Sequence, residues 1–126
     1  MSTLNVSNIT DGTTTVGTSY VVNGSAKVHC TYDCDPATVL GSHNVSSLTD
    51  NGTGDHTVNM TNAFSGIYYT PATHGKYLTT TKGGTVAGNS TSTKTASALQ
   101  LHATHGSALS GADMNEVNVS IHGDLA

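Results

Sequence analysis

The chain has 126 residues and a mass of 12.8 kDa, which is the size of one ordinary domain. Hydrophobic residues make up 35% of it and charged residues 10%, both below the share usual in globular proteins. Four lysines and no arginine leave little basic surface, which argues against nucleic-acid binding. No apolar run reaches the roughly 20 residues that span a bilayer, and the first residues lack the basic and apolar regions of a signal peptide. We therefore expect a soluble protein that neither binds membranes nor is exported by a cleaved signal.

The polar residues favour β-structure over disorder. Disordered chains combine low hydrophobicity with high net charge, whereas this chain has a net charge of −4 and is rich in serine, threonine, asparagine and glycine. Threonine is β-branched and suits the half-buried surface of a sheet. Because few residues are available for a core, we also expect subunits that share one.

Alternating hydrophobicity predicts strands along the first third of the chain, with little sign of helix. One short strand is expected before the turn signal at residues 11–12. Further strands are expected at residues 20–22, 28–33 and 38–40. In the strand at 28–33, Val28, Cys30 and Tyr32 share one face because successive side chains point to opposite sides. Residues 35–36, Asp-Pro, then turn the chain.

The sharpest local signal is a hairpin in the middle of the chain. Residues 50–54, Asp-Asn-Gly-Thr-Gly, supply the positive φ angles of a tight turn, between strands expected at 44–49 and 55–61. In the second strand Val58 and Met60 point inward, with His56 in register with them. Register and turn type together predict an antiparallel pair.

The remaining strands are expected at residues 67–70, 76–79, 98–102 and 116–122. Pro71 is expected to end the first of them, a turn to occupy 82–84, and a Gly/Ser/Thr-rich loop to cover 85–93. Eight or nine short strands separated by turns predict an all-β fold, an antiparallel and jelly-roll-like β-sandwich. No internal repeat and no second folded domain is evident.

The cysteines and histidines do not indicate a single structural role. Cys30 and Cys34 lie too far apart in an extended strand for a disulfide, which becomes possible only where the chain turns at Cys34. Unpaired thiols, an intrachain bridge, a bridge between subunits and metal ligation therefore all stay open. His102 and His105 fall on opposite faces of a strand, and the aspartates lack the spacing of an EF-hand calcium loop. We predict no metal site and no cofactor.

Catalytic patterns are also missing. Serine never stands in the strand–Gly-x-Ser-x-Gly–helix context of a hydrolase. Glu116 is the single glutamate, and no pair of carboxylates can be assigned to glycoside hydrolysis. We predict that the protein is not an enzyme; a polysaccharide-degrading enzyme is the alternative from another class.

Two segments carry a resemblance to a known family. NGSAK at residues 23–27, a hairpin, and NVSSLTDNGTGDHTVN at 44–59 resemble a β-domain of tail-fibre and other virion proteins of tailed bacteriophages, notably marine ones. VNVSIHGD at 117–124 looks like the closing strand of that domain, and residues 4–20 like its lead-in. The similarity is strongest over 23–59 and weakest between 64 and 112.

The resemblance implies a homotrimeric virion component, made in the bacterial cytoplasm and exposed on the particle. Residues 1–25 would form an anchoring lead-in that binds other virion proteins of the tail or capsid, and residues 26–126 the β-sandwich. We expect a tail-fibre-like appendage for attachment to the host surface. The alternative is a capsid decoration (cement) protein that stabilises the phage head.

Two sets of residues follow from this expectation. Outward loops at 33–38, 70–76 and 85–95 would contact a host surface glycan, with binding candidates Asp33, Asp35, Thr70, His74 and Lys76. Histidines stand where the family usually has aromatic residues, and we expect them at subunit contacts: His29, His43, His56 and His122. Protonation near pH 6 would charge these side chains and loosen the assembly.

Overall fold

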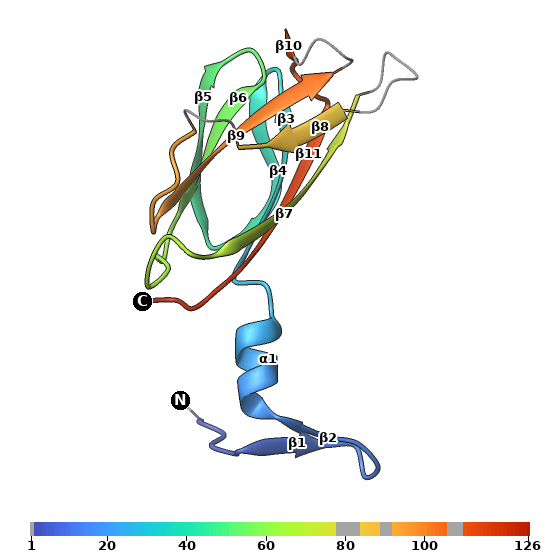
Figure 1. Ribbon diagram of the computed structural model, residues 1–126, viewed down its shortest axis with the longest axis vertical. Coiled ribbons are helices and arrows are strands. Elements are labelled where there is room, and N and C mark those ends of the chain that lie inside the picture. Colours follow the sequence, from blue (N-terminus) through green and yellow to red (C-terminus); the bar gives the residue numbers. More distant parts are fainter. Residues whose placement is uncertain (1, 78–83, 89–91, 106–109) are drawn as a thin grey trace.

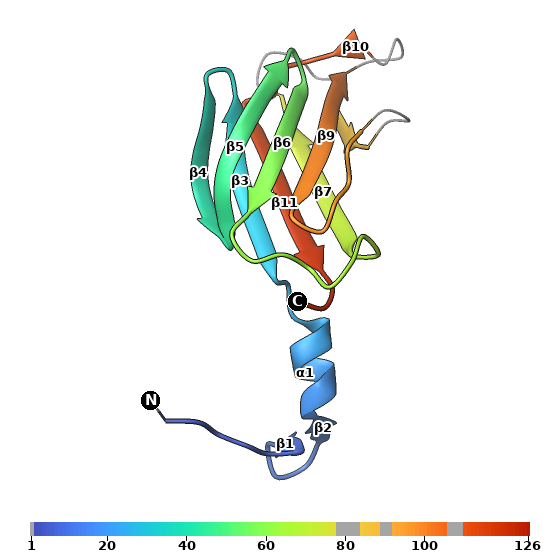
Figure 2. The same cartoon turned by 90° about the vertical axis from the view of Figure 1, so that its left-hand side faces the viewer.

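A computed structural model describes residues 2–77, 84–88, 92–105 and 110–126, and shows two antiparallel sheets packed face to face (Figures 1 and 2). One sheet contains, in spatial order, β4 (Ala37–His43), β3 (Val28–Cys34), β11 (Glu116–His122) and β7 (Thr70–Lys76). The other contains β10 (Ser110–Gly111), β9 (Ala98–His105), β6 (Asp55–Met60) and β5 (Val45–Gly52), and β8 (Gly84–Ala87) also pairs with β9. The predicted all-β antiparallel sandwich is confirmed.

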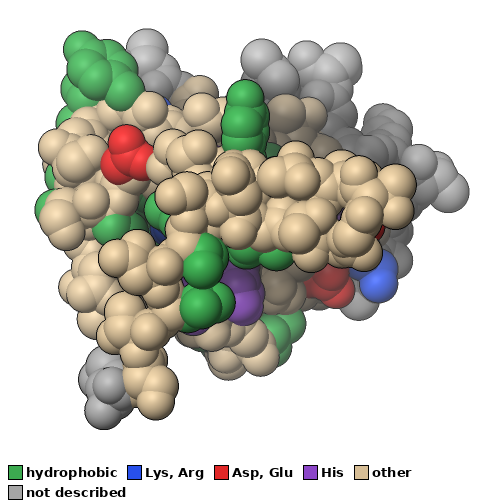
Figure 3. Space-filling view, turned by 90° about the horizontal axis from the view of Figure 1, so that it is seen from below, with side chains coloured by type: hydrophobic (Ala, Val, Ile, Leu, Met, Phe, Trp, Pro, Cys, Tyr) green, Lys and Arg blue, Asp and Glu red, His purple; other side chains and the backbone are tan. Residues whose placement is uncertain are grey.

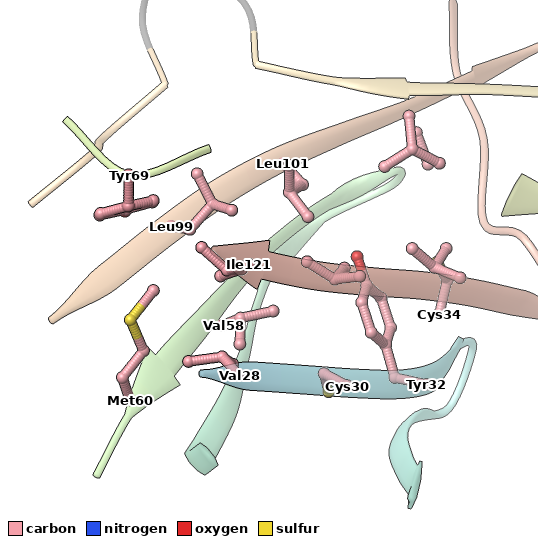
Figure 4. Packing of buried hydrophobic residues seen from close by; sticks show 14 of the residues in the cluster. Val28, Cys30, Tyr32, Cys34, Val58, Met60, Tyr69, Leu99, Leu101 and Ile121 are labelled. Carbon is pink, nitrogen blue, oxygen red and sulfur yellow. The ribbon is translucent and has the colours of Figure 1, made fainter. Parts of the chain in front are cut away.

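The core lies between the sheets and follows the alternation of the sequence. On β3 every second residue, from Val28 to Cys34, is buried, and β11 repeats the pattern with Val117, Val119 and Ile121. Val58 of β6 closes the core from the opposite sheet (Figure 4). The predicted inward faces of these three strands are confirmed.

The central hairpin is confirmed, but its turn is shorter than predicted, because residues 50–52 belong to β5. β5 pairs with β6 in antiparallel register, and residues 53–54 form the turn between them. Gly52, the last residue of β5, has a φ angle of 128°, and Gly54 in the turn has one of 70°. The Asp50 carboxylate accepts a hydrogen bond of 2.8 Å from the Gly52 backbone N–H. Glycine is favoured at both positions because an L side chain rarely adopts such angles.

Three predicted elements are wrong. Residues 20–22 lie in the helix α1 (Thr18–Gly24), because β1 and β2 pair with each other and a helix satisfies its own backbone without a partner strand. Residues 67–69 are irregular, and the strand β7 begins at Thr70 and includes Pro71. Proline is tolerated there because β7 pairs with β11 alone among the described strands, and so is an edge strand.

The third of these errors concerns the loop expected at 85–93. Thr85–Ala87 instead form β8 together with Gly84, which was expected in the preceding turn. The register of β8 with β9 pairs Val86 with Ala103 and buries both. Some expected residues lie outside the described part of the chain: the strand residues 78–79, the turn residues 82–83 and the loop residues 89–91.

Within the described residues, no helix has the length and apolar character that crossing a membrane requires.

Candidate functional site

The first 25 residues stand apart from the sandwich. β1 (Asn8–Thr10) and β2 (Thr15–Gly17) form a small hairpin that leads into α1, and all three project from the end where the chain enters β3 (Figures 1 and 2). No residue of α1 is buried, and Gly17 at its N-cap supplies no side-chain hydrogen bond. Isolated helices shorter than about 12 residues are marginal in water, and this helix has seven residues.

Local hydrogen bonds order the hairpin. The Asp11 carboxylate accepts bonds of 2.9 and 2.8 Å from the backbone N–H groups of Thr13 and Thr14. These bonds, that of Thr14 foremost, lower the pKa of Asp11. Thr18 at the start of α1 donates its hydroxyl to the Val6 carbonyl at 3.0 Å. The segment is therefore shaped by itself rather than by packing on the sandwich.

Its surface is apolar. Leu4 and Tyr20 are 82% and 77% exposed, and in the described chain this segment holds seven of the twelve exposed large hydrophobic residues. They are Leu4, Val6, Ile9, Val16, Tyr20, Val21 and Val22. We call residues 2–25 with these side chains the apolar segment. Figure 3 views the molecule from this end, where hydrophobic side chains stand out. Exposed apolar clusters of this kind mark interaction sites.

Few contacts join the apolar segment to the sandwich. His122 Nδ1 lies 3.2 Å from the Gly24 carbonyl, and the Lys27 ammonium donates to the Val22 carbonyl. Beside the junction lies a pocket lined by Asn23 of α1 and, from the sandwich, by Phe64, Ser65, Gly66, Tyr68, Tyr69, Gly123 and Asp124. The apolar side chains themselves stay uncovered in the single chain.

A second surface, which is polar, covers the outer face of the four-stranded sheet. Strand register places the residues that point away from the core side by side: His29 beside His43 and Ser120, and Asn118 between Thr31 and His74. The His29 and His43 rings stack with centroids 5.8 Å apart, and Thr31 donates to Asn118 at 2.8 Å. We call this surface the histidine face. It is hollowed between β3, β11 and β7.

The structure therefore joins two sets of predicted site residues on one surface. Asp33, Thr70, His74 and Lys76 lie on the same outer face as His29, His43 and His122. The expectation of an outward loop at 70–76 is wrong, because these residues form β7. Asp35 lies in the β3–β4 turn, and the expected loop at 85–95 contains the strand β8.

His56 departs from the prediction altogether. It is 1% exposed, between the sheets, with its ring centroid 5.5 Å from that of Tyr32. A side chain enclosed in the core has no surface to offer a neighbouring subunit, so the expectation of a subunit contact is wrong for His56. Its ring nitrogen Nε2 lies 3.1 Å from the Cys34 carbonyl oxygen.

Both cysteines are free and buried. They are four residues apart on one inward face of β3, so of the alternatives left open by the sequence an intrachain disulfide does not form in this structure. Burial raises the pKa of the Cys30 thiol to about 11. Burial likewise raises the pKa of Cys34 to about 11, and the charges of Asp113, Asp33 and Asp50 act in the same direction.

The Cys30 thiol predicts a loss of stability in alkali. In the unfolded chain the thiol ionises near pH 9, while the folded chain holds it neutral to about pH 11. Its stabilising contribution is therefore complete below pH 9 and is lost as the pH rises to 11, by about 2 kcal/mol. Urea unfolding of wild type and Cys30→Ala at pH 8, 9, 10 and 11 measures this. The wild type is expected to lose stability more steeply, and parallel pH profiles would contradict the prediction.

Comparison with known proteins gives no family to add to this geometry. No protein-family model, curated protein or solved structure matches the chain.

Proposed function

We propose that this chain is a non-enzymatic structural subunit of a bacteriophage virion, a tail-fibre-like appendage attached through the apolar segment. The exposure of seven large hydrophobic side chains on a segment that stands outside the sandwich carries the proposal. Removing such a surface from water by contact with another protein is favourable, and exposed apolar clusters mark interaction sites for this reason. The resemblance of residues 23–59 and 117–124 to phage virion β-domains supplies the setting.

In this proposal the two ends of the molecule have different roles. The apolar segment binds another virion protein of the tail or capsid, and the sandwiches of three copies associate into a homotrimer. Threefold association covers sheet edges and polar β surface that a single chain leaves exposed. The histidine face, with its hydroxyl, amide and imidazole groups, is suited to hydrogen bonding with a host surface glycan or with a neighbouring subunit.

Substitution in α1 tests the attachment. Val22 and Leu40 are both 59% exposed, the first in the apolar segment and the second on β4 of the sandwich. Val22→Asp is expected to reduce the amount of chain in purified virions by about tenfold or more, because a charge in an apolar contact costs well over the 1.4 kcal/mol of one decade. Quantitative mass spectrometry of particles measures the incorporation. Leu40→Asp is the matched control, and native mass spectrometry first establishes that this variant forms the same oligomer as the wild type.

Equal incorporation of wild type and Val22→Asp would overturn the role of the apolar segment.

The copy number of the chain in the same particles distinguishes a tail location from a capsid location. A few to a few dozen copies fit a tail appendage, and hundreds fit the capsid decoration protein that is the alternative. Native mass spectrometry of the purified chain is expected to give three times 12.8 kDa, about 38 kDa, for the trimer.

A further inference from the structure

Three side chains that share no sequence motif meet where β3 ends and β6 begins. In Figure 1 the end of β3 lies opposite the apolar segment. The Cys34 sulfur, a ring nitrogen of His56 and a carboxylate oxygen of Asp113 all lie within 4.8 Å of one another. Cys34 and His56 are almost fully buried, and Asp113 is partly buried. They belong to β3, to β6 and to the stretch between β10 and β11, so the group joins both sheets.

The hydrogen bonding of His56 leaves one ring nitrogen without a partner. A carbonyl oxygen only accepts, so Nε2 carries the proton that it donates to the Cys34 carbonyl at 3.1 Å. Nδ1 then holds a lone pair, and it is buried with no hydrogen-bond partner. Histidines that ligate metals commonly have this arrangement, in which a backbone carbonyl fixes the other ring nitrogen.

Asp113 is held in place by backbone on both sides of it. Its carboxylate accepts a hydrogen bond of 2.7 Å from the Gly54 N–H. The preceding residue, Ala112, donates to the Ala103 carbonyl of β9 at 2.9 Å, and the following residue, Met114, accepts from the Cys34 N–H of β3 at 3.0 Å. The carboxylate is thus positioned by contacts to both sheets.

The surroundings are negatively charged. The carboxylates of Asp33 and Asp50 lie close enough to influence the Cys34 thiol, together with that of Asp113. Each ion pair found among the described residues joins a histidine to an aspartate. No described lysine forms an ion pair with His56 or Asp113. A pocket lined by Asp33, Asp35 and Asp113, among other residues, opens beside it. Of the three side chains, Asp113 is the one that this pocket reaches from the solvent side.

We propose that Cys34, His56 and Asp113 bind a thiophilic divalent cation of the zinc type. Sulfur, imidazole nitrogen and carboxylate oxygen form the donor set that zinc prefers in proteins. Zinc binds such atoms at about 2.0–2.3 Å, so neighbouring ligands of a tetrahedron lie about 3.5 Å apart and the three atoms need to approach by about 1 Å. Binding transfers the Cys34 thiol proton to solvent and its sulfur lone pair to the cation, with no redox change. Water completes the coordination.

The bound ion would connect the two sheets at the end where the stretch containing Asp113 closes the sandwich. A small domain with a thin core and two unbridged cysteines gains stability from such a connection. The site is independent of the proposed attachment, since it lies at the opposite end from the apolar segment.

Cobalt(II) is the probe for this site. The purified full chain, reduced with a phosphine that does not ligate the metal, is titrated with Co²⁺. A thiolate-to-cobalt charge-transfer band in the near ultraviolet is expected, with one ion bound per chain and displaced by Zn²⁺. Absence of the band in the folded wild type overturns the proposal.

Matched variants assign the ligands. Cys30 lies on the same strand and face as Cys34 and is equally buried, so Cys34→Ser is expected to abolish the band while Cys30→Ser retains it. Asp113→Asn keeps an acceptor for the Gly54 N–H and removes the charge. It is expected to weaken Co²⁺ binding by more than about tenfold, since even groups that only support a ligand are often worth that much.

Two measurements keep the test decisive where a core substitution prevents folding. Near-ultraviolet circular dichroism reports whether each variant is folded. If Cys34→Ser does not fold, the Asp113→Asn variant, changed at a partly buried position, is used in its place. Loss of the band in folded Cys30→Ser with retention in Cys34→Ser overturns the assignment. Unchanged affinity in folded Asp113→Asn does so as well.

Discussion

Replacing Gly54 with alanine is expected to lower the free energy of unfolding by about 4 kcal/mol, through a clash added to backbone strain. A Cβ at this position would lie 2.4 Å from the Ala103 carbonyl oxygen and 2.5 Å from the Ala112 nitrogen. Both are backbone atoms of the opposing segments and cannot rotate away. The φ of 70° adds the cost of an L side chain in the left-handed region.

Gly52, the last residue of β5 in the same hairpin, provides the matched control. Its φ of 128° is also unfavourable for alanine, but an added Cβ would have no atom within 4 Å. Gly52→Ala is therefore expected to cost only about 1–2 kcal/mol, the conformational part alone. Urea unfolding of both variants measures the difference. Equal costs would show that the close approach at Gly54 is not a constraint on the fold.

Ile121→Ala is expected to lower the free energy of unfolding by about 3 kcal/mol, because it leaves a cavity between the sheets. The Ile121 side chain on β11 is fully buried, close to Val28 and Val58 (Figure 4). The same substitution at Ile67, whose side chain is 47% exposed in an irregular segment, is expected to cost less than about 1 kcal/mol. Thermal and urea unfolding of the pair compare the two positions, and similar losses would contradict the assigned core.

Both predictions bear on the proposed cation site. Gly54 carries the N–H that binds the Asp113 carboxylate, so a displaced hairpin turn also moves a ligand. Zn²⁺ stabilises the folded state by mass action when it binds that state alone. Stability measurements should therefore be made both with added Zn²⁺ and with a chelator.

Local patterns were enough to predict much of the sheet structure. The inward faces of β3, β6 and β11 follow from alternation, because a strand has a fixed period of two and one face must avoid water. The hairpin at residues 50–54 follows from glycines that accept positive φ angles. Which strands pair with one another was harder to predict from the sequence. Thr85–Ala87 carry little hydrophobic signal and form β8 because β9 offers an edge to pair with.

The candidate sites were only partly within reach of the sequence. Alternation already places His29 on the face opposite Cys30, and strand register then brings it beside His43 and Ser120. The group of Cys34, His56 and Asp113 had no sequence signal, since its members are 22 and 57 residues apart along the chain. The inward register of His56 with Val58 was a clue, because a buried imidazole needs partners from another element.

By itself, the sequence determined the all-β class, the faces of the main strands and the turn between β5 and β6, since these depend on neighbours a few residues away. The tertiary structure decided that residues 18–24 form a helix outside the sandwich, where no described strand pairs with them and no described part of the core covers their apolar side chains. It also decided which polar side chains meet. Contacts between β3, β6 and the stretch before β11 arise only when two sheets pack, and no local pattern encodes that juxtaposition.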